Sequence, residues 1–192
     1  LCQGADLTGR LPQATLTLWE ELRAQGRCPA SLARLEVAVL CRLRSLTAEG
    51  FAQLPDISEG LENRLAAAVQ GAGTLDELVQ AMRTKRYATA RLRRLVLDAA
   101  LGYTGDLPAL PPYLHVLGAN ETGLAVLRCA RQAALLPLSH SLADLAARSA
   151  PAARVAAAHA AAEDLTALCL RHPAPMGAAY TAKPVFPTSG AK

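Results

Sequence analysis

The chain has 192 residues, of which 52% are hydrophobic, 19% charged and 4% aromatic, and its formal net charge at pH 7 is +4. This composition is typical of a globular protein and excludes a chain that is disordered throughout. The richest apolar run, Val155 to Leu170, is broken by His159, Glu163 and Asp164, so the sequence predicts neither a membrane-spanning segment nor a membrane partner. Alanine and leucine dominate over strand-forming residues, which favours a mainly α-helical fold.

The first part of the chain shows the pattern of a helical lobe. Residues 1–13 are polar and contain Gly and Pro, which indicates a linker or a disordered end. Helical patterns follow over Ala14 to Gln25 and Ser31 to Leu46. A further short helix is expected from Thr47, and Pro55 stops it because proline disfavours the helical conformation of the residue before it.

Two capping boxes and one apolar stripe predict the next helices. Asp56-Ile-Ser-Glu59 predicts a helix through Val69, and Thr74-Leu-Asp-Glu77 predicts one that ends near Thr84. After Tyr87 another helix is expected to end at Gly102. Its buried face would consist of apolar residues at helical spacing, namely Leu92, Leu95, Val96 and Ala99.

The sequence then changes to the pattern of a small α/β lobe. Strands are expected over Tyr113 to Leu117 and Leu136 to Ser139, with a helix over Glu121 to Ala133, capped by Asn120, between them. This order predicts a short parallel β-α-β unit. The remaining expected features are a short helix capped by Ser141, a helix from Pro151 to about Leu170, and an extended tail after Pro173 and Pro175.

The expected organisation is therefore mainly α with a small α/β part. Residues 1–13 form a linker or disordered end, residues 14–110 a helical RNA-facing lobe, and residues 111–192 a small α/β lobe with an extended tail.

Catalytic and metal-binding motifs are scarce. His115, His140, His159 and His172 lie in four different predicted elements, and none has a second histidine at i+4, so we expect no metal site and no catalytic residue among them. Gly118 to Gly123 joins a strand to a helix but lacks the Lys-Ser/Thr of a P-loop and the third glycine of a dinucleotide site. We interpret it as a simple turn.

The cysteines show no sign of a shared site. Their spacing contains no C-x-x-C pair, and their number is odd: Cys2, Cys28, Cys41, Cys129 and Cys169. Such a set is not typical of a disulfide framework or a zinc site. We expect reduced, mostly buried cysteines without metal, in a cytoplasmic protein.

The strongest physical signal is a run of positive charge, here called the basic segment, from Arg83 to Arg94. It contains six of the 20 Lys and Arg residues and none of the 16 Asp and Glu residues. A solvated helix face usually mixes charges of both signs, so the unmixed charge favours a surface for nucleic-acid phosphates. The expected RNA-binding residues are Arg83, Lys85, Arg86, Tyr87, Arg91, Arg93 and Arg94.

Two other interpretations of the basic segment remain open. Thr74 to Leu101 is compatible with a helix-turn-helix that binds DNA, although its turn has no glycine and its second helix has no Asn or Gln for base edges. Alternatively, the region is a non-catalytic helical interaction domain whose arginines pair with an acidic partner.

Three motifs in order resemble one known family. They are "SEGLENR" (Ser58 to Arg64), "TKRY" followed by an "ARxRR" helix start (Thr84 to Arg94), and "PPYLHVLGANETG" (Pro111 to Gly123). Over most of the chain, this arrangement resembles the C-terminal part of the bacterial tRNA(Met) cytidine acetate ligase family. Members join an N-terminal nucleotidyltransferase-like domain with a "HIGH"-type motif to a C-terminal region.

The resemblance implies an ATP-dependent ligase. Members use ATP, with Mg, and acetate to form acetyl-adenylate, and then acetylate N4 of the wobble cytidine of elongator tRNA(Met). This chain contains no H-x-G-H sequence, so ATP is expected to bind in the N-terminal nucleotidyltransferase-like domain. That domain is the expected partner of this chain, and the chain alone is expected to be inactive. Asn63 and Arg64 of "SEGLENR" are expected to contact RNA or the active site. Ala88 replaces the family's usual Thr, which leaves Thr89 as the expected N-cap.

Overall fold

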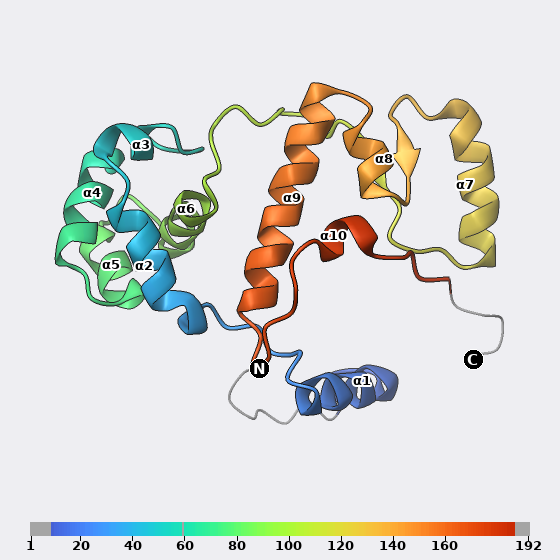
Figure 1. Cartoon of the computed structure of the whole chain (residues 1–192), viewed down its shortest axis with the longest axis horizontal. Coiled ribbons are helices and arrows are strands. Elements are labelled where there is room, and N and C mark those ends of the chain that lie inside the picture. The colour runs from blue at the N-terminus through green and yellow to red at the C-terminus, as the bar shows by residue number, and fades with distance from the viewer. Residues whose placement is uncertain (1–8, 59, 187–192) are drawn as a thin grey trace. The chain divides into compact units, whose positions relative to one another are not determined.

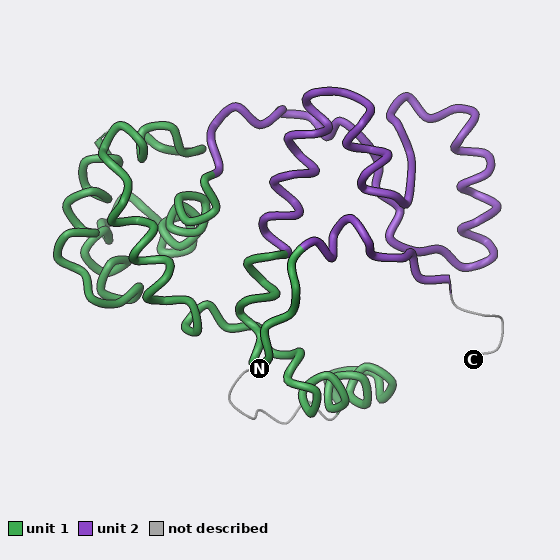
Figure 2. The backbone as a smooth tube through the Cα atoms, viewed as in Figure 1, with its two compact units in different colours: residues 1–102, 164–176 green, residues 103–163, 177–192 purple. Residues whose placement is uncertain are grey.

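The computed structural model describes residues 9–58 and 60–186, and over these residues the chain is mainly helical with a two-stranded parallel sheet. The expected fold class, mainly α with a small α/β part, is confirmed. Figure 2 shows two compact units, unit 1 with residues 1–102 and 164–176 and unit 2 with residues 103–163 and 177–192. This division differs from the two lobes expected on either side of residue 110, because residues 164–176 belong with unit 1.

Unit 1 is a helical unit built around one hydrophobic core. Its fully buried side chains come from five helices and include Leu43, Phe51, Leu65, Leu78 and Leu92. Its α-helices, labelled in Figure 1, are α1 (Gln13–Ala24), α2 (Glu36–Arg44), α3 (Ala48–Ala52), α4 (Leu61–Gly71), α5 (Leu75–Met82) and α6 (Thr89–Leu101), and the 3-10 helix η1 (Leu32–Leu35) precedes α2.

The helix that follows the basic turn forms as its apolar spacing predicts. Leu92, Leu95, Val96 and Ala99 are all buried, which confirms the stripe expected at i, i+3, i+4 and i+7. Gly102 ends α6 in the left-handed conformation, at a φ of 71°, which glycine adopts without steric cost. The stripe fixes which side of α6 faces the core, and therefore which side its arginines can occupy.

Helix starts differ from the expected ones where side-chain caps fail. The predicted Asp56 capping box is wrong, because Asp56 has a φ of 59° instead of the extended backbone of an N-cap, and α4 begins only at Leu61 after Gly60. Glu59 lies outside the described residues. The second box is confirmed at Thr74, whose Oγ1 accepts a hydrogen bond from the Glu77 amide at 3.1 Å.

Two further expectations about unit 1 need correction. The single helix expected over Ser31 to Leu46 is a 3-10 turn followed by α2. Ala88, and not Thr89, occupies the N-cap position of α6, and its side chain cannot accept a capping hydrogen bond.

Unit 2 contains the predicted parallel pair of strands. β1 (Leu114–His115) pairs with β2 (Leu138–Ser139) in parallel, and α7 (Glu121–Ala133) is the connection between them, so the β-α-β unit is confirmed. Both strands are shorter than expected. The remaining elements are α8 (Leu142–Ala146), α9 (Ala150–Leu168), whose residues from 164 on belong to unit 1, and α10 (Ala178–Thr181). The tail is therefore not simply extended.

Small side chains form most of the core of unit 2. Ala152, Ala156 and Ala160 lie at i, i+4 and i+8 on one face of α9 and are buried with Leu142 and Leu145 of α8. Asn120 and Ser141 cap α7 and α8 through their side-chain oxygens, as predicted. α7 itself has no buried residue. Within the described part of the chain, no helix has both the length and the apolar character needed to cross a membrane.

The cysteines are more exposed than expected. Cys41 and Cys129 are exposed, Cys28 is half-buried, and only Cys169 is buried among the four that the structure describes. The expectation of mostly buried cysteines is wrong for these residues, because the helices that carry Cys41 and Cys129 turn those positions toward solvent. Cys2 lies outside the described residues.

Candidate nucleic-acid interface

The basic segment begins with a tight turn between α5 and α6. Thr84 and Tyr87 form an isolated antiparallel bridge, and the Arg86 amide donates a hydrogen bond to Thr84 Oγ1 at 3.1 Å. Lys85 and Arg86, at the tip of this turn, are exposed. The local hydrogen bonds therefore fix the turn backbone and leave these two charged side chains on the surface of unit 1.

Tyr87 lies beside two guanidinium groups. The centre of its ring is 5.2 Å from the guanidinium carbon of Arg91 and 6.0 Å from that of Arg86. At these distances the electron-rich face of the ring attracts both cations. Tyr87 is half-buried and packs against the hydrophobic core, so it holds the turn on the core while it contacts the arginines.

Arg91 has partners inside the fold. Its Nη2 donates to the backbone carbonyl of Asp56 at 2.6 Å and to Ser58 Oγ at 3.4 Å, and its side chain is half-buried. A guanidinium that donates to a carbonyl supplies the loop before α4 with a fixed partner. Arg91 therefore has a structural contact in addition to the RNA-binding role expected from the sequence.

Arg93 and Arg94 follow on the exposed side of α6. Arg93 lies 3.8 Å from the Asp76 carboxylate, with both side chains largely exposed, and exposed pairs of this kind contribute little to stability. Arg83, just after α5, donates to Gln80 Oε1 at 3.2 Å and is also exposed. These arginines keep their charge accessible to a ligand.

Asp98 is the acidic group next to Arg94 on α6. Burial raises the pKa of this carboxyl above its ordinary value, the negative charge of Asp56 raises it further, and the positive charge of Arg94 acts in the opposite direction. Arg94 and Asp98, at i and i+4 of α6, thus interact electrostatically. It does not remove the positive charge at the start of α6.

Asn63 and Arg64 lie on the first turn of α4, and both are exposed. Asn63 Nδ2 donates to Glu62 Oε1 at 3.2 Å. Their helix starts directly after the loop that Arg91 contacts, so α4 and α6 are tied together at the ends that carry these residues.

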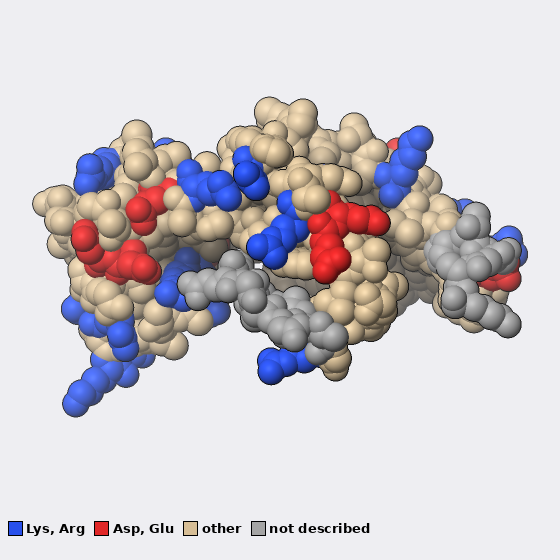
Figure 3. All heavy atoms as spheres, turned by 90° about the horizontal axis from the view of Figure 1, so that it is seen from below, with Lys and Arg blue, Asp and Glu red and all other residues tan. Residues whose placement is uncertain are grey.

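Basic side chains are prominent on the surface. On the face shown in Figure 3, they lie at many places, several of them projecting from the edge, and acidic side chains form separate groups among them. Exposed cations attract a polyanion over distances up to the Debye length, which is about 8 Å at physiological salt.

The contact of Arg91 with the loop at Asp56 and Ser58 was not predicted from the sequence. The partners lie 35 and 33 positions apart, and neither loop residue belongs to a motif that indicates an arginine partner. The loop is nevertheless part of the candidate interface, because it fixes the start of α6.

Within the described residues, the histidines are not grouped with enough other potential ligands to hold a metal ion. His115 and His159 lie edge to face with ring centres 5.9 Å apart, and a ring nitrogen of His115 lies 3.2 Å from the His140 carbonyl. The described residues contain no group of three or more His, Cys, Asp or Glu that could hold a metal.

Two backbone amides of the turn from Gly118 to Gly123 donate hydrogen bonds within the fold. The Ala119 amide donates to the Val185 carbonyl at 3.1 Å, and the Gly123 amide donates to Asn120 Oδ1 at 2.8 Å. A phosphate cradle needs several backbone amides that point at one ligand. Two amides of this turn are therefore engaged within the fold.

Comparison with known families matches most of the chain. The model of the HIGH nucleotidyl transferase family matches residues 3–176. The chain belongs to the HIGH nucleotidyl transferase family. Because the match begins at residue 3, this family covers nearly the whole chain, and the expectation that the chain is only a C-terminal part is not confirmed.

Relatives of this HIGH nucleotidyl transferase chain include several ligases. The tRNA(Met) cytidine acetate ligase of Acetivibrio thermocellus is 30% identical over 171 residues, which cover 85% of this chain and 41% of the relative. The tRNA(Met) cytidine acetate ligase of Syntrophomonas wolfei is 32% identical over 127 residues, which cover 64% of this chain and 30% of that protein. The chain therefore spans less than half the length of these relatives.

Solved structures share the fold of the chain. A crystal structure of Thermotoga maritima TmcAL in its apo form superposes with a TM-score of 0.82 at 20% identity, over 92% of this chain and 45% of the other. A second structure of that protein, bound with alpha-thio ATP, gives a TM-score of 0.83 over 92% of this chain and 46% of the other. At this identity the likeness establishes the fold alone.

Proposed function

We propose that this chain is the tRNA-binding part of an ATP-dependent ligase that forms N4-acetylcytidine at the wobble position of elongator tRNA(Met). The observation that carries the proposal is the basic segment, which displays exposed cations on a turn and helix start held in place by Tyr87 and Arg91. The relatives named as tRNA(Met) cytidine acetate ligases support the choice of tRNA as the polyanion.

The cations act by binding and orienting the tRNA. Each Lys or Arg that contacts a phosphate releases condensed counterions, which supplies affinity without reading sequence. The selected residues are Arg83, Lys85, Arg86, Tyr87, Arg91, Arg93 and Arg94, with Asn63 and Arg64 on α4 as further contacts to RNA or the active site. In this role the chain fixes where the wobble base is presented, and it supplies no group to the chemical step.

We propose that another domain, and not this chain, supplies the residues that activate acetate with ATP. The sequence has no H-x-G-H motif, and the Ala119 and Gly123 amides of the turn before α7 are engaged within the fold. A nucleotidyltransferase-like domain that carries the motif would be the partner, and ATP would bind there. The proposed setting is cytoplasmic.

Binding measurements on the purified chain test the proposal. The dissociation constant is measured for elongator tRNA(Met), for an unrelated tRNA and for duplex DNA at several salt concentrations. The proposal predicts the tightest binding for elongator tRNA(Met), with log affinity falling linearly with log salt. Preference for duplex DNA would support the helix-turn-helix interpretation instead, and binding to none of the three would support an interaction with an acidic protein.

A further inference from the structure

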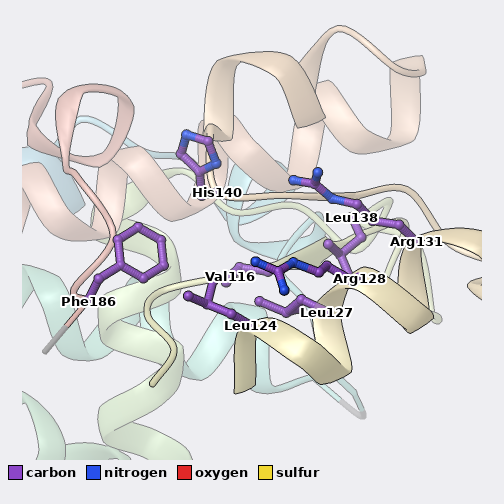
Figure 4. Close-up of a pocket in the computed structure, with 8 residues that line it drawn as sticks. All are labelled: Val116, Leu124, Leu127, Arg128, Arg131, Leu138, His140 and Phe186. Carbon is purple, nitrogen blue, oxygen red and sulfur yellow. The ribbon is translucent and has the colours of Figure 1, made fainter. Parts of the chain in front are cut away.

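A small hollow lies beside α7 in unit 2, far in sequence from the basic segment (Figure 4). Its volume is about 160 Å³, and its apolar side is formed by Val116, Leu124, Leu127 and Leu138. In Figure 4, Arg128 extends toward Val116 and the guanidinium of Arg131 lies toward His140, while the ring of Phe186 faces them across the hollow.

A second hollow adjoins the first and shares two of its residues. It is larger, at about 510 Å³, and both hollows are lined by His140 and Phe186. Tyr180 and Lys183 line only the second one. We call the two hollows together the α7 groove.

The groove combines positive charge with exposed aromatic rings. Its lining contains Arg128, Arg131 and Lys183 together with His140, and no Asp or Glu. Phe186 and Tyr180 are 49% and 41% exposed, so both residues offer ring surface to a ligand in the groove. Cations beside aromatic rings are typical of surfaces that bind single-stranded nucleic acid, where bases stack and phosphates pair with cations.

The size of the first hollow limits what enters it. Pockets that enclose whole small molecules usually measure about 300–1,000 Å³, so a volume of about 160 Å³ is suited to one planar ring system and not to a complete nucleotide cofactor. We propose that the α7 groove binds unpaired nucleotides of RNA, with one base against Phe186 in the smaller hollow and the adjoining phosphates near Arg128 and Arg131. This second site rests on the proposed function only in that it takes RNA as the ligand.

The backbone holds Phe186 in position. The Val185 amide donates to the Leu117 carbonyl at 3.0 Å, and the Val185 carbonyl accepts from the Ala119 amide at 3.1 Å. This close approach requires a glycine between them, because a Cβ on Gly118 would lie 2.6 Å from the Val185 carbonyl oxygen. The glycine therefore lets the segment before Phe186 lie against the end of β1. Backbone hydrogen bonds thus hold the residue that carries the ring beside the hollow.

A tryptophan in place of Phe186 provides a local readout. In the variant Trp19→Phe with Phe186→Trp, the only tryptophan reports from the groove. The probe is a single-stranded hexauridylate or hexaadenylate, added to the whole 192-residue chain. The expected result is saturable quenching of the tryptophan emission, stronger for the adenylate because purines stack over a larger area. Absence of quenching at saturating probe would overturn the proposal.

Two double variants test the arginines at equal charge. Arg128→Ala with Arg131→Ala is expected to weaken hexanucleotide binding about tenfold and to reduce the log-log salt slope by about 1.4, at roughly 0.7 per phosphate contact on a single strand. The control, Arg148→Ala with Arg154→Ala, removes the same charge from unit 2 at residues outside the groove. Equal effects of the two variants would contradict a site in the groove.

Two further outcomes separate this site from other possibilities. Gly118→Ala is expected to weaken hexanucleotide binding. The loss of tRNA(Met) affinity on charge reversal in the basic segment is expected to persist in this variant. The two proposals can therefore be contradicted independently of each other. If an acidic peptide with apolar residues displaces the hexanucleotide and binds more tightly than it, the groove is a protein-docking site and the proposal is wrong.

Discussion

The guanidinium of Arg91 donates a hydrogen bond to the backbone carbonyl of Asp56 at 2.6 Å, although the two residues are 35 positions apart in the chain. The same group reaches Ser58 Oγ at 3.4 Å and lies over the Tyr87 ring. One side chain thus joins the loop before α4, the turn after α5 and the start of α6.

Replacing Arg91 with Ala is therefore expected to lower stability as well as RNA binding. Loss of this hydrogen bond from a charged donor to an exposed loop carbonyl costs on the order of 1 kcal/mol of unfolding free energy. Urea unfolding followed by circular dichroism measures the change. Arg94→Ala is the control, because exposed Arg94 has no such contact and its loss should change stability by less than about 0.5 kcal/mol. Equal stability of the two variants would contradict the structural role of Arg91.

Charge reversal at the exposed cations tests RNA binding without disturbing the fold. The triple variant Lys85→Glu, Arg93→Glu and Arg94→Glu is expected to weaken binding of elongator tRNA(Met) at least about 30-fold and to reduce the salt slope, since each lost phosphate contact lowers it by roughly 0.7–0.9. Fluorescence anisotropy over a range of salt concentrations measures both quantities.

A matched triple variant controls for net charge. It reverses three exposed arginines of unit 1 that lie outside the basic segment: Arg10, Arg23 and Arg34. Binding should fall much less, by the general effect of charge alone. If both triple variants weaken binding equally, the basic segment is only a solvated surface.

The N-cap of α6 is open to improvement. Ala88 has the extended backbone of an N-cap residue, with φ −66° and ψ 139°, but no side-chain oxygen. Ala88→Thr should add a capping hydrogen bond and raise the unfolding free energy by about 1 kcal/mol. Thr74→Ala, at the capped start of α5, should lower it by a similar amount. Thermal unfolding of both variants measures the pair, and a neutral Ala88→Thr would show that the first turn of α6 cannot accept the cap.

Leu95 tests the packed side of α6. It is 3% exposed, so Leu95→Ala should leave a cavity and cost about 2–5 kcal/mol of stability. Val37→Ala is the control, because Val37 is 80% exposed on α2 and its truncation should cost little. Guanidinium unfolding measures both. A loss below about 1 kcal/mol for Leu95→Ala would mean that the stripe is not packed as described.

Asp98 gives the fold a pH dependence with a definite sign. Burial and Asp56 raise its pKa in the folded chain above that in the unfolded chain, so the folded state binds more protons between the two values. Stability then falls as pH rises through the unfolded and folded pKa values, and the loss persists at neutral pH. Asp98→Asn should flatten this fall and raise stability at pH 7 relative to the wild type. Unfolding at pH values from the acid range to 7 measures the difference, and parallel curves for the two proteins would contradict it.

The helices and the parallel strand pair were predictable because their signals are local. The spacing of four apolar residues alone predicts the buried face of α6: Leu92, Leu95, Val96 and Ala99. Thr74 caps α5 as its sequence predicts. The failure at Asp56 has a physical reason. A capping motif requires an extended backbone at its first residue. Asp56 instead adopts a left-handed conformation, which the sequence does not predict.

The candidate sites were predictable only in part. The positive charge of the basic segment is visible in the sequence, and the exposure of Arg93 and Arg94 follows from the helical stripe that they flank. The contact of Arg91 with Asp56 depends on segments far apart in the chain, and so does the hollow that Phe186 lines together with residues of α7. No periodicity or motif predicts such contacts.

The interleaving of the two units has a consequence for synthesis on the ribosome. The Ser31 amide donates to the Cys169 carbonyl at 2.9 Å, and the His172 amide donates to the Gly26 carbonyl at 3.3 Å, all within unit 1. Gly26 lies so close to the His172 ring that a Cβ there would meet Nδ1 at 2.5 Å. The nascent chain must therefore emerge through residues 103–163 before residues 25–31 find these partners. Domains usually fold one after another as they leave the ribosome. Here the helical core around α2 to α6 can form early, whereas the Gly26 carbonyl and the Ser31 amide stay without these two partners until the residues after α9 have been made.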